Sequence, residues 1–118
     1  MEEFEVVFYR RPNGTTPMDE FLESLPPKLN AKVHRDLGAL REEAHKLREP
    51  QSKCMGEGLS ELRSRQGDDI ARSFYFFFSG SRIVVTNGFV KKTRKTPCRE
   101  LARALAYKAD WEERFVNG

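Results

Sequence analysis

Three extended runs in close succession, at 59–65, 70–79 and 82–90, limit the folds open to this chain more than any other feature. Gln66-Gly67-Asp68-Asp69 separates the first two runs, and Ser79-Gly80-Ser81 separates the last two. Both connections are short and turn-like, which favours neighbouring antiparallel strands over parallel strands joined by crossovers. The sequence therefore predicts an antiparallel meander.

The segments before the meander predict one strand and two helices. Phe4 to Tyr9 is a short apolar run that ends at a turn signal, as a first strand would. Thr16-Pro17 offers an N-cap followed by proline, and this helix should run to about Leu25. After Pro26-Pro27, apolar residues recur at helical spacing and predict a second helix to roughly Lys46.

Two further segments complete the expected architecture. Arg48 to Gly58 contains a proline and two glycines and predicts a loop, whereas Thr96-Pro97 repeats the cap-and-proline start of a helix. The expected fold is α+β, with helices packed on an antiparallel sheet in the order β-α-α-β-β-β-α. With 118 residues, the chain should form a single domain spanning 1–118.

Charge is distributed unevenly along the chain. The net charge is only +3, but residues 82–108 hold eight lysines and arginines and a single acid, Glu100. Such asymmetry indicates a polarised surface that suits a polyanion, of which RNA is the favoured one.

Several classes of protein are disfavoured by the residue pattern. No apolar run approaches the ~20 residues of a membrane span, and the acidic start lacks signal-peptide features, so we expect a cytoplasmic protein without membrane contact. Cys54 and Cys98 form no CxxC pair and are predicted to be reduced thiols. No acidic cluster accompanies the basic strands, so we predict no metal and no cofactor.

The basic residues of the strands are the candidate RNA contacts. Alternation places Glu61, Arg63 and Arg65 on one face, where the arginines would contact phosphate or simply pair with Glu61 or water. Arg72 falls in the apolar phase of its strand, so its guanidinium requires either an internal carboxylate or a phosphate in a groove. The basic run after the last strand suits RNA but also fits a solvated loop, and it contains Lys91, Lys92, Arg94 and Lys95.

RNA cleavage by the adjacent 2′-hydroxyl requires no metal. A base removes the hydroxyl proton, cations stabilise the phosphoryl transition state, and an acid protonates the departing oxygen. His34 and His45 both fall on the second helix, away from the basic strands, so neither is predicted to be catalytic. Proton transfer would instead fall to Glu61, Tyr75, a lysine or a partner molecule.

Three segments together resemble a known family. They are Leu59-x-Glu61-Leu62-Arg63, Ala71-Arg72-Ser73-Phe74-Tyr75-Phe76 and Asn87-Gly88-Phe89-Val90-Lys91-Lys92-Thr93-x-Lys95-Thr96-Pro97. They resemble the RelE superfamily of toxins, in particular its phage-derived, HigB-like branch, and the similarity in element order covers nearly the whole chain.

The resemblance implies a ribosome-dependent endoribonuclease that cuts messenger RNA in the A site of the small ribosomal subunit. It also implies silencing by a cognate antitoxin, expected to be a helix-turn-helix protein. By the resemblance the catalytic positions are Arg63, Arg72 and Lys91 or Lys92. The remaining cations of the strands and of the basic run, Arg65, Arg94 and Lys95, are predicted RNA contacts. Better-known members carry lysines where this chain has Ser60 and Glu61.

Two other functions remain open from the sequence. One is a non-catalytic RNA- or ribosome-binding module of the same fold, which would use the same cations without a base. The other is an interaction protein whose basic edge pairs with an acidic partner.

Overall fold

The computed structural model describes residues 4–44, 47, 51–91 and 97–116. This part of the chain forms one five-stranded sheet and three helices. In chain order the elements are β1 (Glu5–Phe8), α1 (Pro17–Glu23), α2 (Pro27–Glu43), β2 (Ser52–Gly56), β3 (Leu59–Gln66), β4 (Asp69–Phe78), β5 (Arg82–Lys91) and α3 (Cys98–Val116).

The sheet has the strand order β1-β5-β4-β3-β2, with the predicted meander β3-β4-β5 in its centre. All neighbours are antiparallel except β1, which pairs in parallel with β5. The α+β class is therefore confirmed. The sequence did not specify the place of the first strand, and the structure puts it at one edge of the sheet.

The second edge strand corrects one sequence prediction. Ser52–Gly56 was expected to lie in a loop, but it forms β2 and pairs antiparallel with β3. Three residues with positive φ, Gly56, Glu57 and Gly58, make the tight connection that turns β2 back into β3. The strand was missed because two glycines and a short, mostly exposed segment carry little strand signal, and pairing with β3 decides its conformation.

The helices agree with the prediction apart from their ends. Thr16 occupies the N-cap of α1 without a side-chain capping bond, and Pro17 is its first helical residue. This helix ends at Glu23, two residues before the expected end, and Ser24 donates its hydroxyl hydrogen to the Phe21 carbonyl. The expected end of α2 at Lys46 and the expected cap at Thr96 lie outside the described residues.

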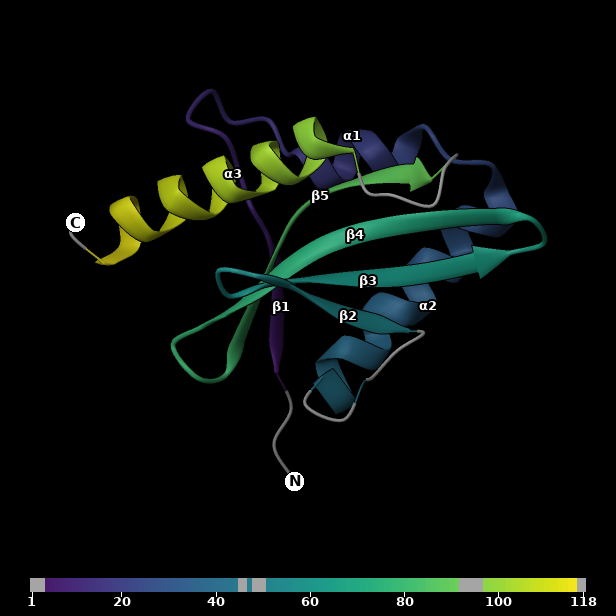
Figure 1. Ribbon diagram of the computed structural model, residues 1–118, viewed down its shortest axis with the longest axis horizontal. Helices are drawn as coiled ribbons and strands as arrows, with labels where there is room; N and C mark the ends of the chain where they lie inside the picture. Colours follow the sequence, from purple (N-terminus) through teal and green to yellow (C-terminus); the bar gives the residue numbers. More distant parts are fainter. Residues whose placement is uncertain (1–3, 45–46, 48–50, 92–96, 117–118) are drawn as a thin grey trace.

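Helices cover both faces of the sheet (Figure 1). α1 and α2 pack on one face against a core that includes Leu62, Tyr75 and Val85. α3 packs on the other face against a second core that includes Phe74 and Phe76. The β3–β4 hairpin extends past the start of α3 (Figure 1). Within the described chain, no helix has the length and apolarity that a membrane crossing demands.

Gly88 allows α1 to approach the sheet closely. A Cβ atom at this position would lie 2.5 Å from the Phe21 ring and 2.9 Å from the carbonyl oxygen of Arg72. Neither distance is compatible with a side chain, so the glycine is required by packing.

We expect Gly88→Ala to lower the free energy of unfolding by about 1 to 3 kcal/mol, because the ring or the β4 backbone must move. Gly38→Ala is the matched control, since a Cβ on this helical glycine meets no atom within 4 Å. That control should gain about 0.5 to 1 kcal/mol from helix propensity. Urea unfolding of both variants measures the difference, and equal effects would contradict the packing argument.

A polar and aromatic cluster fastens α3 to the end of β1. The Tyr9 hydroxyl donates to Asp110 Oδ2 over 2.6 Å, and the Tyr9 and Tyr107 rings stack with centroids 4.7 Å apart. Arg114 donates to the same carboxylate oxygen over 2.7 Å and lies over the Tyr9 ring. Burial, followed by the bond to Asp110, raises the pKa of Tyr9 from 10.0 to about 12.

The raised pKa of Tyr9 predicts alkaline sensitivity. A phenol that is harder to ionise in the folded protein adds stability below pH 10, and this contribution disappears as the pH rises to about 12. The wild type should therefore lose about 2 to 3 kcal/mol more than Tyr9→Phe over this range. Denaturant unfolding at pH 9, 10, 11 and 12 tests this, and parallel pH curves for the two proteins would disprove it.

Candidate nucleic-acid interface

Arg63 and Arg72 lie directly opposite each other on adjacent strands. The β3–β4 register pairs Arg63 with Arg72, Glu61 with Phe74 and Arg65 with Ile70. Because side chains of directly paired residues share a face, Glu61 and the three arginines all belong to the face that α3 partly covers. The predicted alternation of β3 is thus confirmed.

Glu61 lies beneath these arginines and is fully buried. Its Oε1 accepts a hydrogen bond from Arg72 Nη1 at 2.5 Å and another from Arg63 Nε at 3.2 Å. The exposed fractions of the two arginine side chains are 7% for Arg72 and 20% for Arg63, so both ion pairs are shielded from water. One carboxylate thereby holds two guanidinium groups side by side.

The arginines line a common cavity of about 270 Å³, which we call the basic cavity. Its described lining residues are Lys32, Gln51, Arg63, Arg65, Ile70 and Arg72. Arg72 uses one side of its guanidinium for Glu61, but its Nε is buried and has no partner in the described chain. The two roles considered for Arg72 from the sequence, a carboxylate partner and a place in a groove, therefore occur together.

The residues of the basic cavity carry more positive than negative charge. Three arginines and one lysine line it; Glu61 pairs with Arg63 and Arg72, and Asp36 pairs with Lys32. Arg65 makes no ion pair or hydrogen bond with any residue that the structure describes, so its donors are open to a ligand. A buried guanidinium donor without a partner is costly, and an anionic oxygen would satisfy it.

Lys32 and Gln51 are members of the cavity that sequence reasoning missed. Lys32 comes from α2, where its Nζ lies 2.8 Å from Asp36 Oδ1 one turn later. Gln51 precedes β2, and its carbonyl accepts a hydrogen bond from the Arg63 backbone N–H. The Lys32–Asp36 spacing was visible in the sequence, but nothing there indicated that α2 reaches the edge of β3.

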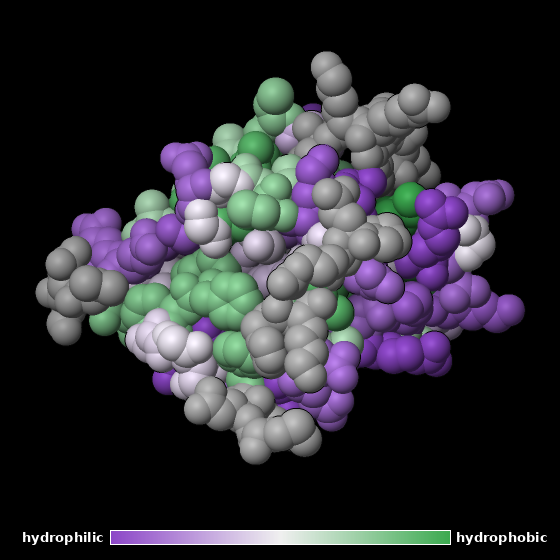
Figure 2. All heavy atoms as spheres, turned by 60° about the horizontal axis from the view of Figure 1, so that its bottom comes forward, coloured by the Kyte–Doolittle hydropathy of each residue, from purple (hydrophilic) through white to green (hydrophobic). Residues whose placement is uncertain are grey.

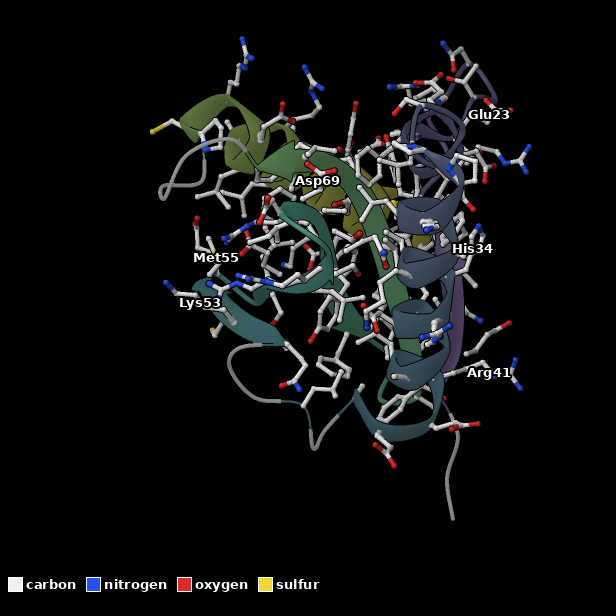
Figure 3. The ribbon with its side chains drawn as sticks, turned by 90° about the vertical axis from the view of Figure 1, so that its right-hand side faces the viewer. Glu23, His34, Arg41, Lys53, Met55 and Asp69 are labelled. Atoms are coloured by element: carbon white, nitrogen blue, oxygen red, sulfur yellow. The ribbon has the colours of Figure 1, made fainter. Side chains whose placement is uncertain are left out.

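Other predicted residues lie elsewhere or outside the described part. Lys91 pairs with Ile70 at the end of β5, whereas Lys92, Arg94 and Lys95 fall outside the described residues, as does His45. His34 is exposed and points away from the sheet on α2, like Arg41 (Figure 3). His34 is therefore a helix-surface residue, in agreement with the sequence prediction.

The Tyr75 hydroxyl does not line the basic cavity. It lies 2.5 Å from Ser52 Oγ and borders a larger depression of about 800 Å³ between the end of α2 and strands β2 to β4. That depression is lined by apolar groups such as Phe4, Leu47 and Phe77, with Lys53 as its one charged residue among those described. Its size exceeds that of the basic cavity, but its chemistry does not suit a phosphate.

The surface of the molecule also separates the apolar depression from the basic cavity. Figure 2 shows apolar side chains gathered over the left-centre of one face and hydrophilic ones crowding its right-hand side. The right-hand side in Figure 1 holds the β3–β4 turn, next to the basic cavity. This face of the molecule therefore separates an apolar region from a hydrophilic one (Figure 2).

The structure is an α+β sheet with a cationic cavity on strands β3 and β4. Residues 20–108 match the model of the family described as phage-derived protein Gp49-like. The chain belongs to this family, which is a family of RelE/HigB-type toxins, and the resemblance recognised in the sequence is confirmed.

A solved structure supports the fold. The chain is similar to a chain in the crystal structure of the toxin-antitoxin complex RelBE2 from Mycobacterium tuberculosis, with 21% identity and a TM-score of 0.53. The similarity covers 75% of this chain and 99% of that one. A search of curated proteins gives no match.

The burial of Glu61 predicts unequal effects of the arginine substitutions. Arg72→Ala removes the closer partner of a fully buried carboxylate and should lower the free energy of unfolding by about 3 kcal/mol or more. Arg65→Ala removes no ion pair and should change it by less than about 0.5 kcal/mol. Urea denaturation distinguishes the two, and similar stabilities would contradict the proposed dependence on Glu61.

Proposed function

We propose that the protein is a toxin of a toxin-antitoxin system that cleaves messenger RNA in the ribosomal A site without a metal. The observation that carries this proposal is the basic cavity, where Arg63, Arg65 and Arg72 converge from two adjacent strands. Family membership supports the toxin assignment, and the assembly named for the similar structure supports an antitoxin partner.

The cavity has the chemistry that a phosphodiester requires. Guanidinium groups bind phosphate oxygens through paired N–H donors, and they remain charged throughout the reaction. As the 2′-oxygen attacks phosphorus, negative charge accumulates on the phosphoryl oxygens, and preorganised cations stabilise that charge most when water is excluded. Arg72 meets this condition best, because it is nearly buried and its buried Nε has no partner in the described chain.

Proton transfer requires a group other than these arginines, since an arginine does not release its proton in proteins. The reaction removes a proton from the 2′-hydroxyl and delivers one to the departing 5′-oxygen. Lys32 in the cavity, the proposed catalytic residues Lys91 and Lys92, and groups of the ribosome are the candidates for these steps. Arg94 and Lys95 are proposed to contact the RNA backbone beside them.

Phosphate contacts alone carry no sequence information. We therefore infer that the ribosome aligns the message and that the codon in the A site decides the place of cleavage. A helix-turn-helix antitoxin would neutralise the toxin, and both proteins would act in the cytoplasm, where translating ribosomes are found.

Induced expression should arrest growth and produce new 5′ ends within translated messages, detected by primer extension. Arg65→Ala should lower the cleavage rate at least tenfold at wild-type stability, because Arg65 offers its donors to the substrate without supporting the fold. Arg72→Lys retains the charge but loses the fork geometry, and we expect a larger loss.

Glu57→Gln, an exposed change in the β2–β3 turn, serves as the control and should cleave like the wild type. Stalled ribosomes without new 5′ ends would overturn the cleavage mechanism and favour a non-catalytic ribosome-binding module. Unchanged cleavage in Arg65→Ala and Arg72→Lys would refute the assignment of the basic cavity as the site.

A further inference from the structure

Glu61 bonds to two cations of the site and yet does not itself line the basic cavity. It has no exposed surface, and both guanidinium groups are bonded to the same oxygen. We infer that Glu61 is a positioning residue, which sets the geometry of Arg63 and Arg72 for a phosphodiester and takes no part in proton transfer. This inference rests on the proposed function of the cavity.

The register explains why a positioning group is needed. Arg63 and Arg72 are directly opposed on neighbouring strands, a place where two like charges repel and would move apart. A carboxylate bonded to both compensates one of the two charges and draws the guanidinium groups to a common point. The pair keeps a net positive charge, and this charge is what an anionic substrate meets at the cavity.

The bonding pattern also determines which donors face the ligand. Arg72 gives Nη1 to Glu61, and Arg63 gives Nε. Arg72 Nε is buried and has no partner in the described chain, so it is the donor of the pair that the carboxylate leaves unsatisfied. Loss of the carboxylate would remove the common acceptor of Arg72 Nη1 and Arg63 Nε, and this arrangement of donors would be lost.

Access argues against a catalytic proton at Glu61. A general base must reach the 2′-hydroxyl within hydrogen-bond distance or through one water molecule. Glu61 is covered, and its bonded oxygen is directed at Arg63 and Arg72, the residues that line the cavity in its place. The substrate would therefore meet the arginines and not the carboxylate.

Glu61→Gln separates positioning from charge because it keeps the side-chain volume and removes the negative charge. The net positive charge at the cavity rises by one, so association with the message should not weaken, and KM should stay equal or fall. The arginines lose their common acceptor, so kcat for cleavage on programmed ribosomes should fall at least tenfold. Glu5→Gln is the matched control, since it breaks the exposed Glu5–Arg82 pair between β1 and β5, at the edge of the sheet far from β3.

A direct readout of side-chain order makes the test independent of catalysis. In ¹⁵N-labelled protein the Nε–H signals of Arg63 and Arg72, assigned from Arg63→Lys and Arg72→Lys, should be narrow and slow to exchange with water. In Glu61→Gln they should broaden and exchange faster, whereas in Glu5→Gln they should not change. Inorganic phosphate should shift the Arg72 signal in the wild type, and this shift should be smaller in Glu61→Gln.

Glu61→Asp is the second variant, to be used if Glu61→Gln does not fold. It retains the charge but withdraws the carboxylate by one methylene, so positioning predicts a lower kcat with KM unchanged. The inference is overturned if kcat per folded molecule is the same in the Glu61 variants as in the wild type. It is also overturned if the Arg63 and Arg72 Nε–H signals stay ordered in Glu61→Gln while this variant loses an acidic limb of the wild-type pH profile, because Glu61 would then transfer a proton. A wild type that never cleaves RNA rejects the proposed function alone, and the signals and the phosphate titration then decide the positioning role.

Discussion

The ion pairs of the buried Glu61 with Arg63 and Arg72 are the interaction on which the arrangement of the site depends. A carboxylate with no exposed surface is tolerated only when cations compensate it, and two directly opposed arginines are tolerated only when an anion separates their charges. The carboxylate therefore offsets the repulsion between the two arginines, and the arginines offset the cost of burying the carboxylate. The same network that stabilises the centre of the sheet holds its cations at one place.

The rest of the fold keeps this network in place. Two apolar cores, one on each face, enclose the sheet, so the strands that carry the charged residues have little freedom to shift. Gly88 brings α1 against β5 beside the Arg72 carbonyl, and the Tyr9–Asp110–Arg114 cluster fastens α3 to the opposite face. A rigid sheet is a suitable support for groups that must be preorganised toward a developing charge.

Substitutions at the network have two consequences that must be separated. Removal of Arg72 deprives the cavity of a cation and at the same time leaves Glu61 short of a partner. A loss of toxicity in such a variant could thus arise from misfolding alone. Arg65, which lines the same cavity without an ion pair in the described chain, reports on substrate contact more directly.

The sequence predicted those elements that depend on neighbouring residues or on a periodic residue pattern. The meander followed from two short turns, the common face of Glu61, Arg63 and Arg65 from strand alternation, and the helix starts from prolines. β2 escaped prediction because its conformation depends on pairing with β3 rather than on its own residues. The end expected for α1 was two residues late, because Ser24 bonds back to the Phe21 carbonyl before the prolines are reached.

The α+β class, the family and the cations of the central strands could be predicted from the residues alone, because periodicity, turn residues and motif spacing are all properties of the linear chain. Three features of the site became visible only in the folded chain: Glu61 is buried, Tyr75 borders a different depression, and Lys32 reaches the basic cavity from α2. Strand alternation tells which face a side chain takes, but burial depends on what packs against that face. Contacts between residues distant in the chain depend on helix and strand placement, which no local pattern specifies.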